Sequence, residues 1–394
     1  MGRALGVAAL LVSVAYIPGI AGAGFTSRWL VLAVCSVFLF GIVHIRYTPA
    51  HRWGIALLAY AFVSIAFEPV FWEGLNGFLQ LLILGLIFTL GSQATDLRPV
   101  YAGFALGITI NLLFVVPQMF GYTPVSWVNV PAGLFVNRTL LGEAAALALV
   151  GALVTRQWWC VPGPAVCVAL AQNRGSWLAL GVCSAIWLFR RNVAFGLAIF
   201  FLLPVAAFGL ANYGRWYGPL ERIYLWRDTL DGLSIFGNGI GSFYSMIPAF
   251  GHRLEGVVRE AHAHSDPLEL AFELGAPGVV ATAAILWAAF RAPDSFGDKL
   301  VLVAFLVEGL VGFTAHMPAT GFVGFVVAGA LCGRRYRLWK PVALGAFRER
   351  FRLGSARAAK DRAASDARRG DVVPARLCDP RATDQHALGL SLDA

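Results

Sequence analysis

The stretch GLNGFLQLLILGLIFTLG, residues 74–91, is eighteen residues long and contains no Asp, Glu, Lys, Arg or His. Such a run is typical of a membrane-crossing helix, because about 20 apolar residues span the hydrocarbon core of a bilayer. Similar runs fill most of the chain up to residue 333, at 4–22, 29–45, 53–67, 99–120, 139–155, 158–172, 176–189, 193–211, 267–290, 300–317 and 319–333. They are too long and too uniformly apolar for barrel strands. The sequence therefore predicts an all-α polytopic membrane protein with about twelve transmembrane helices.

The composition of the 394 residues leads to the same class. Hydrophobic residues make up 58% of the chain and charged residues 13%, whereas soluble domains carry about 25% charged residues. A water-soluble globule would lack the polar surface to cover this apolar material. The six cysteines have the spacing of neither a disulfide framework nor a zinc site.

Lys and Arg residues between the runs predict the orientation. Alternate loops carry most of these charges, while the short loops on the other side carry only Arg28, Arg138 and Arg174. This bias predicts cytoplasmic termini and a long periplasmic loop, residues 212–266. The first run also has the features of a cleavable signal peptide, but the regular alternation of charge from Arg3 onward favours its retention.

The chain is predicted to divide into a transmembrane domain, residues 1–333, and a basic tail, residues 334–394. The tail carries most of the net charge of +9 and lacks long apolar runs. We expect it to be cytoplasmic and either to lie on anionic membrane lipids or to stay disordered, rather than to bind nucleic acid.

Two arginines stand at the predicted outer ends of spans, in Asn137-Arg138 and Asn173-Arg174-Gly175. A charge at the centre of a bilayer costs about 2.5 to 3.5 kcal/mol, so a charge in or beside a span needs an explanation. A planar guanidinium suits a diphosphate, which it can bind through two hydrogen bonds. The alternative for each arginine is a side chain that snorkels from a tight turn.

A third polar segment is REAHAHSDPLELAFELGAPGVV, residues 259–280. Asp266 and Glu269 have the spacing of an N-cap and its capping-box carboxylate, so a helix is predicted to begin at Asp266. His262 and His264 precede this helix, where the dipole favours a neutral imidazole and therefore a general base. Glu273 lies inside the predicted span and is expected to pair with an outer arginine.

Two alternatives stay open for the histidines. They can be solvated loop residues, or they can belong to a metal site formed by His262 and His264 with His252 or Asp266. No fixed helical spacing gathers these ligands, so no metal is predicted. His316, near the outer end of run 300–317, is interpreted as structural.

Within the long loop, PLERIYLWRDTLDGLSIFGNGIGSFY, residues 219–244, predicts an amphipathic helix that carries Arg222 and Arg227. It is followed by a glycine-rich turn at residues 237–241. This turn is not a dinucleotide fingerprint, because no strand and helix of a βαβ unit flank it. The turn is instead interpreted as a helix end followed by a tight turn.

Residues 133–333 resemble the O-antigen ligase and polymerase superfamily of bacterial membrane glycosyltransferases. Four segments carry the resemblance in order, GLFVNRTLLGE, QNRGSWLALG, WRDTLDGLSIFGNGIGSFY and HAHSDPLELAFELGAPG. The resemblance implies an inner-membrane enzyme whose site faces the periplasm. Such an enzyme moves a glycan from undecaprenyl diphosphate to a hydroxyl of the lipid A core, a growing glycan chain or a protein. The resemblance also implies that it needs no metal or other cofactor.

Individual positions extend this resemblance. His264 matches the family histidine that precedes a small polar residue, normally Asn and here Ser265. Arg174 matches the arginine of a Ser-Arg-Gly element, with Asn173 in place of the serine, and Arg138 stands where many members have a second asparagine. We therefore expect His264 and Arg174 to be catalytic. The residues expected to bind substrate are Arg138, Arg222, Arg227, His262 and Glu273.

The expected reaction is a single in-line displacement with inversion, because no pair of carboxylates offers a nucleophile for double displacement. A chain polymerase, which uses a second lipid-linked glycan as acceptor, is the alternative within this class. A flippase or secondary transporter is the alternative outside it. The polar groups gather at one predicted face and the chain has no sequence-related halves, which favours the enzyme over the transporter.

Overall fold

A computed structural model describes residues 1–18, 23–122, 130–135, 137–194, 196, 217–250, 261–293 and 295–335. The chain divides into two units, Met1–Pro341 and Val342–Ala394. The predicted domain boundary at residue 333 falls within the first unit. The second unit, which contains most of the predicted tail, lies outside the described residues.

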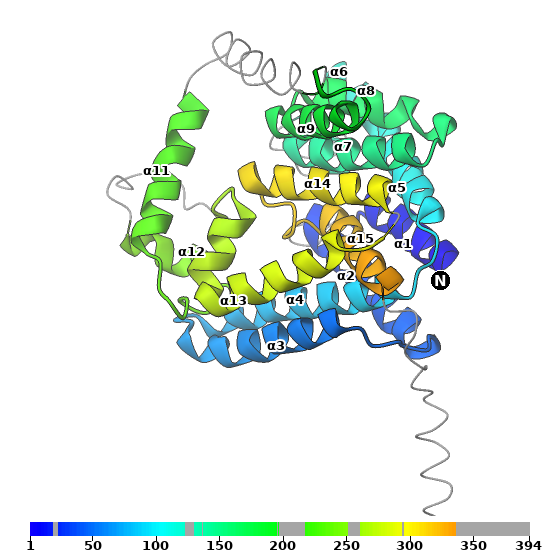
Figure 1. Ribbon diagram of the computed structural model, residues 1–394. Helices are drawn as coiled ribbons and strands as arrows, with labels where there is room; N and C mark the ends of the chain where they lie inside the picture. Colours follow the sequence, from blue (N-terminus) through cyan, green and yellow to red (C-terminus); the bar gives the residue numbers. More distant parts are fainter. Residues whose placement is uncertain are drawn as a thin grey trace, which may run out of the picture. The chain divides into compact units, whose positions relative to one another are not determined.

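The described residues form helices and no β-strand, as the sequence predicts (Figure 1). The first helices are α1 (Gly2–Val14), α2 (Ala23–Ile42), α3 (Pro49–Ser64), α4 (Phe71–Ser92), α5 (Arg98–Ile110), α6 (Leu112–Met119), α7 (Arg138–Val154), α8 (Pro162–Ala171) and α9 (Arg174–Arg191). The later ones are α11 (Tyr217–Asp231), α12 (Phe243–Met246), α13 (Asp266–Phe290), α14 (Phe296–Val311) and α15 (Pro318–Arg335). Short 3-10 helices lie at Ile65–Phe67, Trp158–Cys160 and Ile247–Ala249.

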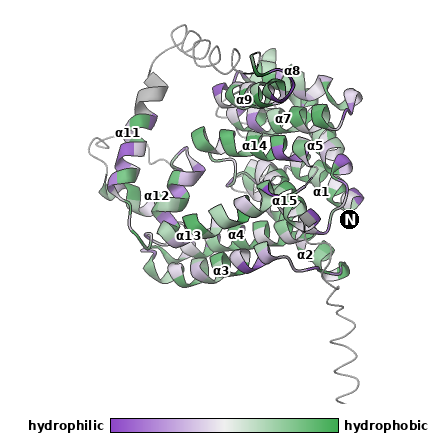
Figure 2. Cartoon of the chain, in the orientation of Figure 1, coloured by the Kyte–Doolittle hydropathy of each residue, from purple (hydrophilic) through white to green (hydrophobic). Residues whose placement is uncertain are grey.

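Among the described residues, five helical segments are long and apolar enough to cross a membrane, namely Ala23–Ile42, Pro49–Phe67, Phe71–Ser92, Arg98–Met119 and Asp266–Phe290. Figure 2 shows hydrophobic residues along α13 and α14, whereas α11 and α12 carry more hydrophilic ones. One face of α2 presents Val34, Val37, Phe38 and Ile42, each more than 60% exposed. Such a face is costly in water and favourable in hydrocarbon. These features indicate a membrane protein.

In the described part of the chain, helices occupy eleven of the twelve predicted apolar runs. The other run, 193–211, lies almost wholly outside the described residues. One boundary differs in a way that matters for function. Run 300–317 predicts a span that reaches residue 317, but α14 ends at Val311. Gly312 has an extended backbone with φ −150° and ψ −161°, so residues 312–317 form a loop before α15.

Helices α4 and α15 pack backbone against backbone. A Cβ atom at Gly91 would overlap the carbonyl oxygen of Val326, and one at Gly329 would overlap that of Phe88. Glycines allow membrane helices to approach this closely. The contact fixes two helices that form walls of the pocket described below.

Helix α13 is interrupted at Gly275, whose φ of 57° and ψ of −157° belong to a region that is essentially limited to glycine. The glycine-rich turn at residues 237–241 packs against this break. The amide of Gly239 donates a hydrogen bond to the carbonyl oxygen of Glu273 at 3.0 Å. The sequence predicts the turn but neither the break nor their contact.

Arg28 is buried within α2, with 3% of its surface exposed, and is not the loop charge that the sequence suggests. Its guanidinium stacks over the ring of Phe135 at 4.1 Å. It donates hydrogen bonds to four main-chain carbonyl oxygens, those of Val12, Ser13, Gly24 and Leu134. Arg28 therefore joins α1, α2 and the segment before α7.

We expect Arg28→Lys to lower the free energy of unfolding by about 2 kcal/mol, because a single ammonium cannot satisfy carbonyls in four directions. Thermal unfolding in detergent, followed by tryptophan fluorescence, measures the change. Arg3→Lys, at an exposed position, is the control and should melt like the wild type. Equal melting temperatures for the two variants would show that the Arg28 hydrogen bonds contribute little.

Candidate functional site

The loop between α14 and α15 brings distant parts of the chain together. The carbonyl oxygen of Val311, just before the loop, accepts a hydrogen bond from Nη1 of Arg222 in α11 at 2.9 Å. Within the loop, the Phe313 ring contacts those of His262 and His264, with centroid distances of 4.7 Å and 5.1 Å. The loop therefore contacts both the amphipathic helix and the segment that precedes α13.

Asp266 ties this loop to the start of α13. Its Oδ2 accepts hydrogen bonds from Thr314 Oγ1 and the Ala315 amide, both at 3.0 Å, and its Oδ1 lies 3.1 Å from Nδ1 of His316. The predicted N-cap role of Asp266 is wrong by one residue, because Ser265 occupies the N-cap position. The carboxylate of Asp266 is directed instead to residues about fifty positions away in the sequence.

Glu269 lies between two histidines. Its Oε1 is 2.8 Å from Nδ1 of His262 and 3.3 Å from Nε2 of His316. Its Oε2 accepts a hydrogen bond from the Ala263 amide at 2.8 Å, and its side chain is 3% exposed. Glu269 does bind a backbone amide before the helix, as a capping residue would, but its closest side-chain partners are the two imidazoles.

The protonation of His316, which lies outside the helices, depends on these carboxylates. Burial alone lowers the pKa of its imidazole, but Glu269 and Asp266 raise that pKa by more, to about 10. The two carboxylates thus favour a positive charge between them. The sequence analysis interprets His316 as structural and does not predict these two carboxylates beside its ring, because they lie far from it in the sequence.

Arg138 and Arg174 begin α7 and α9, as the sequence predicts. Their N-caps, Asn137 and Asn173, each accept a hydrogen bond from the amide two residues on, at 2.9 Å and 3.1 Å. Nδ2 of Asn173 also donates to the carbonyl oxygen of Thr139 at 3.1 Å, which ties the two helix starts together. Both arginine side chains are exposed. Two neighbouring helix N-termini with two arginines favour an anion.

The other predicted substrate-binding residues have different surroundings. Arg222 is partly buried against α14. Arg227 is 71% exposed and lies 3.9 Å from Asp231 on the same helix. Oε1 of Glu273 accepts a hydrogen bond from the Phe243 amide at 3.3 Å, where an arginine partner had been expected.

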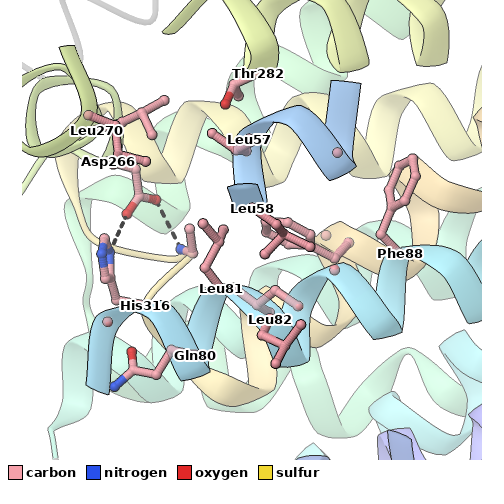
Figure 3. A pocket seen from close by; sticks show the side chains of 18 of the residues that line it. Leu57, Leu58, Gln80, Leu81, Leu82, Phe88, Asp266, Leu270, Thr282 and His316 are labelled. Carbon is pink, nitrogen blue, oxygen red and sulfur yellow. Dashed lines mark hydrogen bonds and ion pairs between the residues drawn. The ribbon is translucent and has the colours of Figure 1, made fainter. Parts of the chain in front are cut away.

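A pocket of about 850 Å³ has its polar end at this site. That end is lined by His262, Asp266, Glu269, Glu273 and His316. Figure 3 shows Asp266 and His316 at one end, with apolar side chains farther along, among them Leu57, Leu58, Leu81, Leu82 and Phe88. Of the predicted site residues, His262 and Glu273 line the pocket. The others, which lie outside its lining, are His264, Arg138, Arg174, Arg222 and Arg227.

Sequence reasoning missed two carboxylates within the helices. Glu143 in α7 is 3% exposed and Glu308 in α14 is fully buried. A Cβ atom at Gly312 would lie 2.7 Å from Oε1 of Glu143, so this carboxylate faces the start of the site loop. The charge itself was the available signal, since an ionisable residue inside an apolar run is costly and marks functional sites.

The residues that could bind a metal differ from those considered from the sequence. His252 lies outside the described residues, and the His264 ring contacts Phe313. The structure instead gathers His262, Glu269 and His316, whose nearest ligand atoms all lie within 4.8 Å of one another.

Comparison with protein-family models and with curated proteins found no significant match to this chain.

Proposed function

We propose that the chain is a bacterial inner-membrane glycosyltransferase, similar to O-antigen ligases, that moves a glycan from undecaprenyl diphosphate to an acceptor hydroxyl. The observation that carries the proposal is the pocket of about 850 Å³. Histidines and carboxylates meet at one end and apolar side chains form the walls. This division suits an amphiphilic substrate with a polar reacting group and a long hydrocarbon chain.

The proposed topology has about twelve spans, cytoplasmic termini and a site that faces the periplasm. The Lys and Arg bias between the runs supports it. The same bias assigns the starts of α7, α9 and α13 to the outer side, and these helix starts carry Arg138, Arg174 and Asp266. Donor lipid, acceptor and membrane lipids are the proposed partners.

In the proposed reaction, Arg174, Arg138 and Arg222 neutralise the diphosphate of the donor, and His264 takes the proton of the acceptor hydroxyl. The acceptor oxygen bonds to the anomeric carbon as the bond to the diphosphate breaks, and the diphosphate leaves with the electron pair. A diphosphate is a good leaving group, so positioning and charge neutralisation are the main requirements. Phe313, which contacts both His262 and His264, links this base to the polar end of the pocket.

The test is transfer in vesicles that contain the purified protein, an undecaprenyl-diphosphate oligosaccharide and candidate acceptors. His264 has a left-handed backbone with φ of 50°, which asparagine tolerates, so His264→Asn removes the imidazole with little strain. We expect His264→Asn and Arg174→Ala each to lower the transfer rate about 100-fold. His44→Ala and Arg52→Ala, at exposed positions, should transfer like the wild type.

The acceptor consumed separates a ligase, which uses the lipid A core, from a polymerase, which uses a second lipid-linked glycan. Lipid movement across the bilayer without formation of a glycosidic bond would reject the enzyme in favour of a transporter. Unchanged transfer by both site variants would reject the residue roles.

A further inference from the structure

The strongest arrangement outside the proposed chemistry is the set of donor atoms from His262, Glu269 and His316. Nδ1 of His262 and Nε2 of His316 lie 2.8 Å and 3.3 Å from the same oxygen of Glu269. The three atoms lie within 4.8 Å of one another, and they come from the segment before α13, its first turn and the α14–α15 loop. We propose that these three side chains bind a divalent transition-metal ion of the zinc class.

The residues around the three donors are those that a metal site needs. A histidine that binds a metal usually donates its other ring N–H to a carboxylate, which fixes its tautomer. Nδ1 of His316 lies 3.1 Å from Oδ1 of Asp266. In the neutral ring that a metal ion requires, Nδ1 would carry the proton toward Asp266, and Nε2 would present its lone pair on the Glu269 side. Asp266 is itself held by Thr314 and Ala315 at 3.0 Å.

The other two ligands are also oriented. The His262 ring stacks on Phe313, with an interplanar angle of 21°. Oε2 of Glu269 is held by the Ala263 amide at 2.8 Å, which leaves Oε1 to the two histidines. The tautomer of one histidine, the ring plane of the other and the free direction of the carboxylate are therefore set before an ion binds.

Charge and access agree with this assignment. Glu269 and Asp266 bring two negative charges to a largely buried place, where a divalent cation neutralises both. Two imidazoles and one carboxylate favour zinc-class ions over magnesium or calcium, which prefer oxygen ligands. All three ligands line the pocket, so a fourth coordination position would be open to a bound molecule, as in catalytic zinc sites.

The competing arrangement has no ion, and a protonated His316 then bridges Asp266 and Glu269. A binding measurement distinguishes the two arrangements. It uses Zn²⁺ or Co²⁺ alone and the full-length protein in detergent. The protein is stripped with chelator, reloaded and dialysed. Retained metal is measured by mass spectrometry, and cobalt coordination by visible absorption.

We expect the wild type to retain about one ion per chain, with the strong absorption of tetrahedral cobalt. His316→Ala and Glu269→Gln should weaken binding about 100-fold or more, and Asp266→Asn should weaken it about 10-fold through His316. His264→Asn, a change at a neighbouring histidine outside the ligand set, should bind like the wild type. Zinc should raise the melting temperature of the wild type and of His264→Asn but not that of His316→Ala.

The wild-type result decides the matter even if a ligand variant fails to fold. A wild-type protein that retains no ion, or ligand variants that fold and bind as it does, would overturn the site. The measurement uses no glycan substrate, so its failure is distinct from a failure of the proposed transferase function.

Discussion

Gly275→Ala should lower the free energy of unfolding by about 3 kcal/mol or more and the melting temperature by about 5 °C or more. The backbone of Gly275 has φ of 57° and ψ of −157°, which residues with a Cβ atom almost never adopt. The added Cβ would overlap the Ile235 carbonyl oxygen and the Gly237 amide nitrogen, and it would lie 2.6 Å from the carbonyl carbon of Phe236. All three are backbone atoms, so no side chain can move aside.

Gly54→Ala is the matched control. A Cβ atom at Gly54 meets no heavy atom within 4 Å, and the residue lies inside α3, where alanine is the better helix former. This variant should be unchanged or more stable by up to about 1 kcal/mol. If Gly275→Ala melts together with Gly54→Ala, the break in α13 does not contribute to stability as argued.

Glu269→Gln should lower the proposed transfer about 100-fold, or about 2.7 kcal/mol in the barrier. The carboxylate accepts from Ala263 and His262 and lies 3.3 Å from His316. A neutral amide would turn an N–H₂ group toward one of these donors and remove the negative charge that the histidines face. The measurement is the vesicle assay with the lipid-linked donor.

Glu273→Gln provides the comparison, because this buried side chain also lines the pocket and accepts a hydrogen bond from the Phe243 amide. The amide oxygen of glutamine can accept the same bond. We expect a loss of less than about tenfold, since Glu273 interacts with His316 through charge alone, whereas Glu269 lies within hydrogen-bond distance of an imidazole. A similar loss in both variants would indicate a general need for negative charge in the pocket.

Local signals in the sequence predict much of this architecture. The uncharged run at 74–91 becomes α4, and Asn137 and Asn173 cap the helices that begin one residue later. The amphipathic pattern in the long loop becomes α11, which ends just before Gly232. Length, hydropathy and capping act over a few residues, so they can be read without knowledge of the fold.

The site itself depends on contacts between distant residues. Nothing near His316 in the sequence indicates that Asp266 and Glu269 will flank its ring. The capping-box pattern predicts that Asp266 caps its own helix. In the structure its carboxylate instead binds residues of the α14–α15 loop. Gly275 lies in an apolar run that favours an unbroken helix, and its conformation follows from the backbone of residues 235–237, which packs against it.

The contacts of Arg28 have a consequence for comparisons among related sequences. Its guanidinium binds main-chain carbonyl oxygens, and every residue type supplies such an oxygen. Substitutions at Val12, Ser13 or Leu134 therefore leave these hydrogen bonds in place. An alignment should show the arginine as an invariant position without a covarying partner, so contact predictions based on coevolution would overlook the residue that holds three segments together.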